Sequence, residues 1–232
     1  MRSPPRSRRR ERLSPGAIAV AALRLIDRDG LEALSMRRLG EALGVEAMAL
    51  YHHFPSRTAL LDAVTERLVG EIDMPDPSGD VVAWLGEVVR RYIAVADRHP
   101  EAFPLLATRR FNTAAAFGFV ESVVGTLIAA GASPELAVDI FRGLGAFANG
   151  AALAGIAVRQ STVPPATLDA VHLPNVARVA PWLGPEHVDR LFTSSLGMFL
   201  DGVALRLQRS RAASGPRRKS GKKVAKIRRK RR

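Results

Sequence analysis

Residues 35–54 read SMRRLGEALGVEAMALYHHF and predict two short helices joined by a tight turn. Ser35 is suited to cap the first helix, because its hydroxyl can accept a hydrogen bond from a free N–H group of the first turn. Gly44 can adopt the positive φ that ends this helix. The second helix is predicted over residues 46–54, since Pro55 restricts the backbone of the residue before it.

Apolar residues give both helices an inner face. Met36, Leu39 and Leu43 recur at helical spacing in the first helix, and Leu50 and Phe54 do so in the second. Two helices around a glycine turn form a helix-turn-helix, whose second helix can enter the major groove of DNA. Glycine-valine turns between helices also occur in proteins that do not bind DNA.

The flanking residues complete a small helical domain, which we place at residues 13–72. Ser14 and Pro15 are typical of a helix start, and Gly30 is typical of a helix end. Ser56 is suited to cap a fourth helix. The apolar face of that helix consists of Leu60, Leu61, Val64, Leu68 and Ile72.

Residues 74–79, MPDPSG, contain two prolines and a glycine and predict a domain boundary. Beyond it we expect a larger all-α domain over residues 80–208, because no strand alternation is present. Residues 160–184 are rich in proline and predict a loop with at most one short helical turn. Helices are predicted at about residues 80–98, 113–130, 134–159 and 185–208. The predicted fold class is therefore all-α, with a small N-terminal and a larger C-terminal helical domain.

Positive charge is concentrated at the two ends of the chain, whose net charge is +13. Residues 1–12 contain six arginines and one glutamate, and residues 209–232 contain thirteen lysines and arginines and no acid. We expect both segments to be disordered. The basic tail is similar to those of nucleoid-binding proteins and can add contacts to phosphates that carry no sequence information. A tail that only keeps the protein soluble fits the same composition.

Several kinds of site are disfavoured by composition. The chain has no cysteine, which excludes disulfides, cysteine–zinc sites and thiol nucleophiles and suits a reducing cytoplasm. Neighbouring His52 and His53 point about 100° apart on a helix and make a poor metal clamp. No paired nucleophile and base and no glycine-rich phosphate loop is evident, so we expect no metal, no cofactor and no enzymatic activity.

The longest uncharged run, residues 143–158, has sixteen residues. A helix that spans a bilayer needs roughly 20. We therefore expect a cytoplasmic protein without a membrane partner that is associated with the nucleoid.

The N-terminal domain resembles the DNA-binding domain of the tetracycline-repressor (TetR) family of transcriptional regulators. The resemblance is carried by LSMRRL at residues 34–39, LGV at 43–45, LYHHF at 50–54 and LLD at 60–62. Residues 80–208 match the family only in layout. In the family this region is an all-helical domain that binds a ligand and forms the dimer.

The resemblance implies DNA contacts from the motif. Tyr51 and Arg57 occupy positions that contact phosphate in the family, and Arg37 occupies one that can reach a base edge. Tyr51 also fits a residue that only closes the small core, and the two histidines fit an ordinary solvated pair. The expected DNA-binding residues are Ser35, Arg37, Arg38, Ala47, Met48, Ala49, Tyr51, His52, His53 and Arg57.

The resemblance also implies an effector pocket within residues 80–160, although each aromatic residue there also fits plain core. In tetracycline-responsive members a histidine after the fifth helix helps to hold a metal–drug complex. Residues 104–109, PLLATR, contain no histidine, so we expect a largely apolar effector instead. The expected lining residues are Trp84, Phe103, Leu106, Arg109, Phe111, Phe117, Phe147 and Asn149.

A homodimer is the third implication of the resemblance, with the helix at residues 143–155 and the last helix pairing with those of a second copy. An internal core helix of a monomer fits the same apolar sequence. The sequence thus predicts a ligand-responsive regulator, with a repressor as the first interpretation, that binds a palindromic operator in double-stranded DNA and is released by a small-molecule effector. The alternative is a nucleoid-associated DNA-binding protein with limited sequence specificity.

Overall fold

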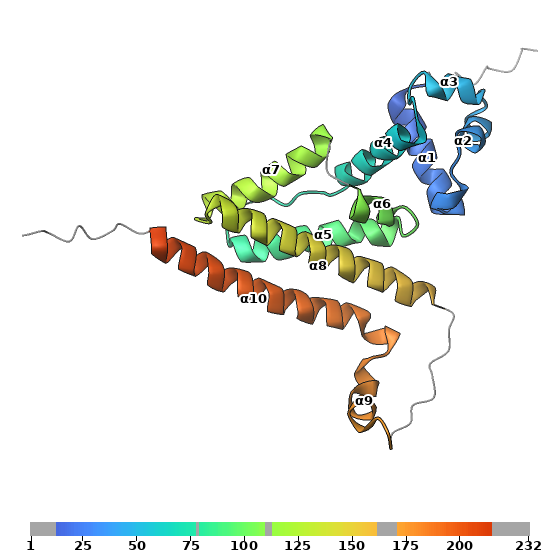
Figure 1. Cartoon of the computed structure of the whole chain (residues 1–232). Helices are drawn as coiled ribbons and strands as arrows, with labels where there is room; N and C mark the ends of the chain where they lie inside the picture. The colour runs from blue at the N-terminus through green and yellow to red at the C-terminus, as the bar shows by residue number, and fades with distance from the viewer. Residues whose placement is uncertain (1–12, 78, 110–112, 162–170, 215–232) are drawn as a thin grey trace, which may run out of the picture.

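The described residues of the computed structural model, 13–77, 79–109, 113–161 and 171–214, form helices and no strand. Figure 1 shows a small group of helices, α1 to α4, at one end of a longer helical body. Within the body, α8 and α10 run along one another, and the segment with α9 projects away from it. The predicted all-α class is confirmed.

The N-terminal group forms where its caps predict. Ser14 Oγ accepts a hydrogen bond from the N–H of Ala17 at 3.2 Å, and the first helix ends at Gly30, whose φ is 84°. Helix α4 packs along α1 and encloses a core that includes Ile18, Leu39 and Leu60. The elements are α1 (Pro15–Asp29), η1 (Leu31–Ala33), α2 (Met36–Leu43), α3 (Ala47–Tyr51) and α4 (Arg57–Gly70).

The two predicted helices of the motif are α2 and α3. Ser35 Oγ accepts from the N–H of Arg38 at 3.2 Å, and Gly44 is left-handed with φ 67° and ψ 34°. Helix α3 is shorter than predicted, because it ends at Tyr51 and not at Phe54. The side chain of Phe54 returns to the core from the turn that follows, where Pro55 disfavours a longer helix.

The C-terminal body is built around α8, which packs against α5, α7 and α10. By length and composition alone α8 could cross a membrane, and the described part of the chain holds no second helix of this kind. The core helix of a soluble protein passes the same test. The elements are α5 (Val81–Arg98), α6 (Phe103–Thr108), α7 (Ala114–Ala129), α8 (Pro134–Gln160), α9 (Pro174–Val179), η2 (Ala180–Trp182), η3 (Pro185–His187) and α10 (Val188–Ser214).

Two segments differ from the sequence-based expectations. Residues 174–182, predicted as part of a loop, form α9 and η2. Helix α10 continues six residues beyond the predicted end at Gln208, so residues 209–214 are helical and not disordered. Two side chains anchor this extension, since Ser210 Oγ donates to the carbonyl of Gly131 at 3.0 Å and Arg211 Nε donates to that of Ala130 at 2.6 Å. Both predicted disordered ends otherwise lie outside the described residues.

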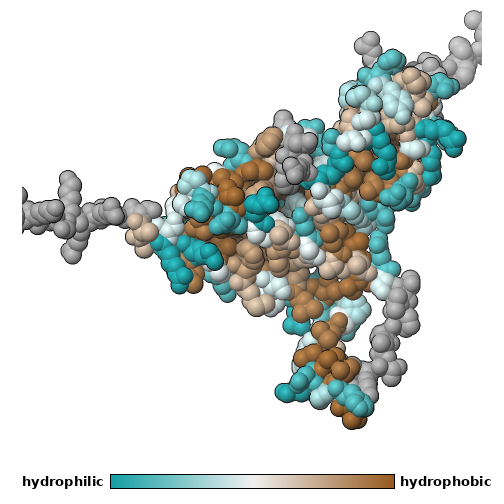
Figure 2. Space-filling model, in the orientation of Figure 1, coloured by the Kyte–Doolittle hydropathy of each residue, from teal (hydrophilic) through white to brown (hydrophobic). Residues whose placement is uncertain are grey.

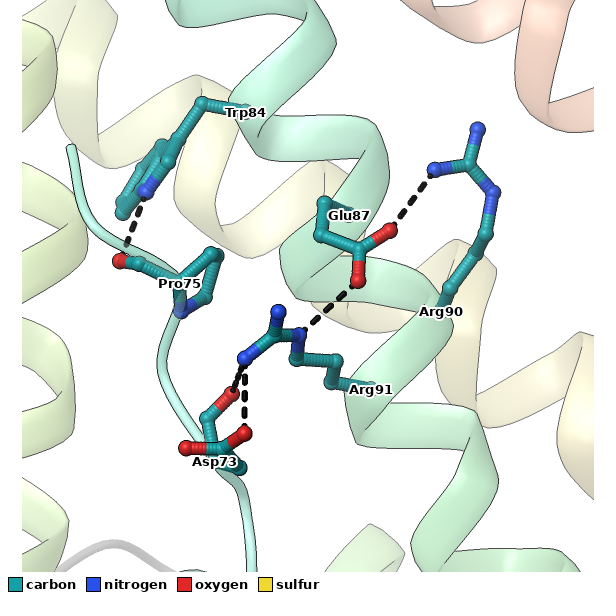
Figure 3. Close-up of polar contacts among 6 residues, drawn as sticks. All are labelled: Asp73, Pro75, Trp84, Glu87, Arg90 and Arg91. Atoms are coloured by element: carbon teal, nitrogen blue, oxygen red, sulfur yellow. Dashed lines mark hydrogen bonds and ion pairs between the residues drawn. The ribbon is translucent and has the colours of Figure 1, made fainter. Parts of the chain in front are cut away.

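The segment after α4 is held against α5 (Figure 3). Arg91 Nη1 donates to the backbone carbonyl of Asp73 at 2.7 Å and to its carboxylate at 2.8 Å. Trp84 Nε1 donates to the carbonyl of Pro75 at 3.1 Å. Arg91 also donates to Glu87 at 2.8 Å, and this hydrogen bond lowers the pKa of the Glu87 carboxyl. Residues 73–75, which we call the strap, are therefore bound along α5 where the predicted boundary segment begins.

His99 makes a second connection between the N-terminal helices and the body. The ring lies at the end of α5, with Nδ1 2.9 Å from Asp27 Oδ2 on α1 and Nε2 2.9 Å from Glu71 Oε2 at the end of α4. Both ring nitrogens thus face carboxylate oxygens. An imidazolium ring can donate from both nitrogens at once.

Candidate functional site

Helices α2 and α3 cross at a backbone contact that requires glycine. A Cβ atom built on Gly40 would lie 2.8 Å from the carbonyl oxygen of Val45 and 3.3 Å from the backbone nitrogen of Ala47. Real Cβ atoms essentially never approach another atom within 3.0 Å. Gly40 therefore allows the close crossing that sets how α3 lies on α2.

Helix α3 exposes a mixed apolar and polar surface. Met48 is 68% exposed, and Tyr51 and His52 are also exposed. Ala49 and His53 are half-buried, and Ala47 is half-buried against the core. Met48, Tyr51 and His52 thus form the outer face of α3, while the two alanines offer only methyl groups to a partner.

The two arginines of α2 have different surroundings. Arg37 has a side chain that is 84% exposed, with only a loose ion pair to Glu41 at 3.6 Å. Arg38 is held more closely, because its Nη2 lies 2.8 Å from Asp29 Oδ2 and its Nη1 donates to the carbonyl of Ala33 at 3.3 Å. Arg37 is therefore the better placed of the two to leave the protein surface for a partner.

Arg57 and Ser35 both have structural contacts within the motif. Arg57 donates from Nε to the carbonyl of Leu34 and from Nη2 to that of Leu31, each at 3.2 Å. The hydroxyl of Ser35 caps α2. Any contact of Arg57 with DNA would therefore compete with, or add to, its link between α4 and η1.

A cavity of about 60 Å³ lies between α5, α7 and α8. Within it the hydroxyl of Tyr92 donates to Asn149 Oδ1 at 2.6 Å, and Asn149 Nδ2 donates to the carbonyl of Ala107 on α6 at 3.3 Å. Burial raises the pKa of the Tyr92 phenol above its ordinary value of 10.0. The lining residues are Leu85, Val88, Val89, Tyr92, Phe119, Val123, Phe141, Leu144, Gly145, Ala148 and Asn149.

Of the predicted lining residues that the structure describes, Asn149 alone lines this cavity. Trp84 is used by the strap on α5, and Phe117 on α7 is 59% exposed. Phe147 packs away from the cavity against α10, where it stacks on Phe192 with ring centroids 6.0 Å apart. The sequence did not place these residues relative to the cavity, because an apolar helical position indicates burial but not which neighbouring helix it packs on.

The other predicted residues that the structure describes lie on α6 or directly after it. Phe103 and Leu106 are buried core residues, and Phe103 meets the ring of Tyr92 edge-on at 5.7 Å. Phe111 lies outside the described residues. The sequence analysis did not identify Tyr92, which lies among the buried, mostly apolar residues of α5. A lone hydroxyl among such residues is itself a signal, since buried polar groups are nearly always hydrogen-bonded.

Arg109 joins the end of α6 to α4. Its Nε lies 3.0 Å from Asp62 Oδ1, its Nη2 also donates to this oxygen, and Nη2 donates to the carbonyl of Thr58 at 3.3 Å. Asn149, which lines the cavity, donates to the backbone carbonyl of Ala107, two residues before Arg109. One short helix thus connects the cavity to α4.

The single chain leaves two apolar surfaces exposed. One is the outer face of α8 and α10, with Val158, Leu191, Met198 and Leu205 exposed. A groove of about 520 Å³ lies on it between the two helices. The second surrounds α9, where Figure 2 shows hydrophobic residues gathered on the projecting segment. Its exposed residues are Val171, Leu173, Val176, Val179, Trp182 and Leu183.

Comparison with known proteins identifies the arrangement. The family described as bacterial regulatory proteins, tetR family, matches residues 18–64, which include α2 and α3. The tetracycline repressor protein class G of Vibrio anguillarum is 30% identical over 145 residues, which are 61% of this chain and 69% of that protein. The chain belongs to the TetR family.

Two further relatives place this TetR-family chain among regulators. An HTH-type transcriptional regulator of Saccharopolyspora erythraea is 35% identical over 130 residues, which are 54% of this chain and 53% of that protein. The chain therefore spans about half the length of that relative. The crystal structure of ActR from Streptomyces coelicolor in complex with actinorhodin has a TM-score of 0.71 at 25% identity, and covers 89% of this chain and 100% of that one. The first of these two proteins is named as a transcriptional regulator and the second as a TetR-family protein.

Among residues 13–77, 79–109, 113–161 and 171–214, no group of three or more histidines, aspartates or glutamates is arranged to hold a metal ion. The cavity is also lined by no histidine.

Proposed function

We propose that this protein is a ligand-responsive transcriptional repressor that binds a palindromic operator as a homodimer and is released by a small molecule. The observation that carries this proposal is the α2–α3 pair. Gly40 allows the two helices to cross closely, and Arg37 on α2 and Met48, Tyr51 and His52 on or directly after α3 are all exposed. Family membership supports the same reading.

Sequence recognition would rest on few direct contacts. Arg37 would reach a guanine edge, with a bidentate pair that discriminates by about 1–3 kcal/mol. Met48 would contact thymine methyl groups, and Tyr51 and Arg57 would contact phosphates together with Ser35 and Arg38. Because Ala47 and Ala49 carry no hydrogen-bonding side chain, the shape of the DNA would supply part of the specificity. His52 and His53 would lie at the edge of this surface.

A homodimer through the outer face of α8 and α10 would place two such surfaces about one DNA turn apart, roughly 34 Å. Support comes from the exposed apolar residues of this face and from the groove between its helices. Contiguous apolar patches are uncommon on monomers and mark interaction sites. Among the small residues of α8, Gly150 has open space around it and would permit close packing with a second copy, whereas Gly143 already packs against Phe199 of α10.

The effector would bind in the cavity between α5, α7 and α8. Support comes from its largely apolar lining and from ActR, a similar fold that was solved with actinorhodin bound. Binding there would reach α4 through α6, because Asn149 holds Ala107 and Arg109 holds Asp62. An effector causes release only if it prefers the arrangement that does not bind DNA.

A nuclease footprint on the DNA that flanks the gene of this protein tests the proposal. We expect protection of one or a few palindromes, a mass of two chains in solution, and loss of protection with an effector. Uniform protection along the DNA would instead support a nucleoid-associated protein of limited specificity, which the thirteen basic residues at 209–232 favour. Either function would place the protein in the cytoplasm on the nucleoid.

A further inference from the structure

The cavity between α5, α7 and α8 has an unusual polar content. Tyr92 and Asn149 supply its polar side chains, and they are bonded to each other at 2.6 Å. None of the described residues that line it carries a charge. A charged ligand that enters the cavity would lose its hydration and find no side chain of opposite charge, which costs far more free energy than burying a neutral group. The cavity therefore selects an uncharged molecule.

The aromatic walls define the shape of that molecule. Phe119 lies with its ring centroid 6.5 Å from that of Tyr92, at an interplanar angle of 31°, and Phe141 lies 6.3 Å from Phe119. Rings at such separations pack well against another flat ring. Phe119 and Phe141 are half-buried. A flat, mostly apolar molecule fits these walls.

The size of the cavity sets the condition for binding. Its volume of about 60 Å³ is well below the roughly 300–1,000 Å³ of typical ligand pockets. An aromatic ligand must therefore displace a side chain that lines it. Tyr92 is the largest residue with a polar contact there, and moving its hydroxyl away leaves Asn149 Oδ1 without its donor.

We propose that the effector of this protein is an uncharged aromatic molecule with a hydroxyl group, and that this hydroxyl replaces that of Tyr92 as the donor to Asn149. The proposal rests on the proposed function, because it names the ligand of the same site. Asn149 Oδ1 accepts a hydrogen bond from the Tyr92 hydroxyl in this structure, so the incoming group must also be a hydrogen-bond donor. A carbonyl or ether oxygen at this position would leave two acceptors facing each other.

Three probes of similar shape test this inference by calorimetry on the full-length protein: 2-naphthol, naphthalene and 2-naphthoate. We expect 2-naphthol to bind about tenfold more tightly than naphthalene, which lacks the donor, and 2-naphthoate to bind more weakly than either because it is charged. Equal affinities for all three, or no binding of 2-naphthol up to its solubility limit, would overturn the proposal.

Two variants test the role of the Tyr92–Asn149 bond. Tyr92→Phe leaves Asn149 Oδ1 without its internal donor, so 2-naphthol should bind several times more tightly to this variant than to the natural protein. Asn149→Leu should remove the preference for 2-naphthol over naphthalene. Asn175→Leu, an exposed position on α9, is the matched control and should keep that preference. Thermal melting establishes that each variant is folded.

Failure of this inference can be told apart from failure of the proposed function. Operator binding without ligand is measured separately by footprinting. If a palindrome is protected but the probes do not discriminate, the ligand class is wrong and the regulator remains. If the probes discriminate but no DNA site is protected, the proposed function is wrong and the ligand site remains.

Discussion

At the scale of single residues, Gly40 is the position where one added carbon atom would disturb the crossing of α2 and α3. A methyl group at Gly40 would meet the backbone of Val45 at 2.8 Å, and backbone cannot move aside as a flexible side chain can. Gly40→Ala should therefore lower the free energy of unfolding by about 1–3 kcal/mol, the usual cost of overpacking, and weaken operator binding. Urea denaturation measures the first effect.

The matched control for this prediction is Gly16→Ala on α1, where no atom lies within 4 Å of a new Cβ. This variant should be neutral or more stable, because alanine favours a helix over glycine by roughly 0.5–1 kcal/mol. Equal effects of the two substitutions would mean that the crossing of α2 and α3 tolerates a side chain at Gly40.

Arg37 carries the prediction about base recognition. Its side chain is the more exposed of the two arginines on α2, so Arg37→Ala should relax specificity at one base pair of each half-site at a cost of about 1–3 kcal/mol. Arg57→Ala should weaken binding to all sequences alike. Because Arg57 also bonds two carbonyls of the motif, its variant must be checked by thermal melting. Affinities for an operator and its single-base variants give the result.

Tyr92 makes stability depend on pH at the alkaline end. Burial raises the pKa of its phenol in the folded protein above the unfolded value of 10.0. The unfolded chain therefore loses this proton first, so the contribution is complete below about pH 10 and is lost as pH rises further. Tyr92→Phe should flatten this part of the profile. Unfolding in urea at a series of alkaline pH values measures it, and an unchanged slope would contradict the burial of the hydroxyl.

At the scale of elements, helix α6 is a hydrogen-bonded connection between the cavity and α4, beside the direct packing of α7 on α4. Breaking its contact with Asp62 through Arg109→Met should leave operator affinity close to that of the natural protein but reduce the factor by which an effector weakens it. Arg142→Met, an exposed position on α8, removes the same charge and should keep the full response. Operator binding with and without effector distinguishes the two variants. A full response in both would show that coupling takes another route.

The sequence was most informative where a structure is decided locally. Ser14, Ser35 and Ser56 cap the helices that they were predicted to cap, because a cap needs only the residue and the first turn after it. Gly44 is left-handed for an equally local reason. The end of α3 and the lining of the cavity were predicted less well, since they depend on which helices meet. Asn149 was found because an amide on an apolar helix stands out.

At the scale of the whole molecule, the effect of the basic tail on DNA binding must be distinguished from the effect of the last turns of α10 on stability. Truncation after Ser214 keeps the contacts of Ser210 and Arg211 with the end of α7, whereas truncation after Gln208 removes them. The first truncation should keep the melting temperature and lower the salt dependence of binding to a random duplex, by roughly 0.9 in slope per lost phosphate contact. The second should also lower the melting temperature. An unchanged slope would show that the tail does not bind DNA.

The strap and the His99 contact have a consequence for building chimeras. A chimera that joins the N-terminal helices of this chain to the C-terminal body of another protein would be cut at residues 74–79, which contain two prolines. In this chain such a cut would separate His99 from Asp27 and Glu71, and Arg91 from Asp73. The unit to transfer is therefore the N-terminal helices together with their partners Arg91 and His99 on and after α5, and a chimera must keep both.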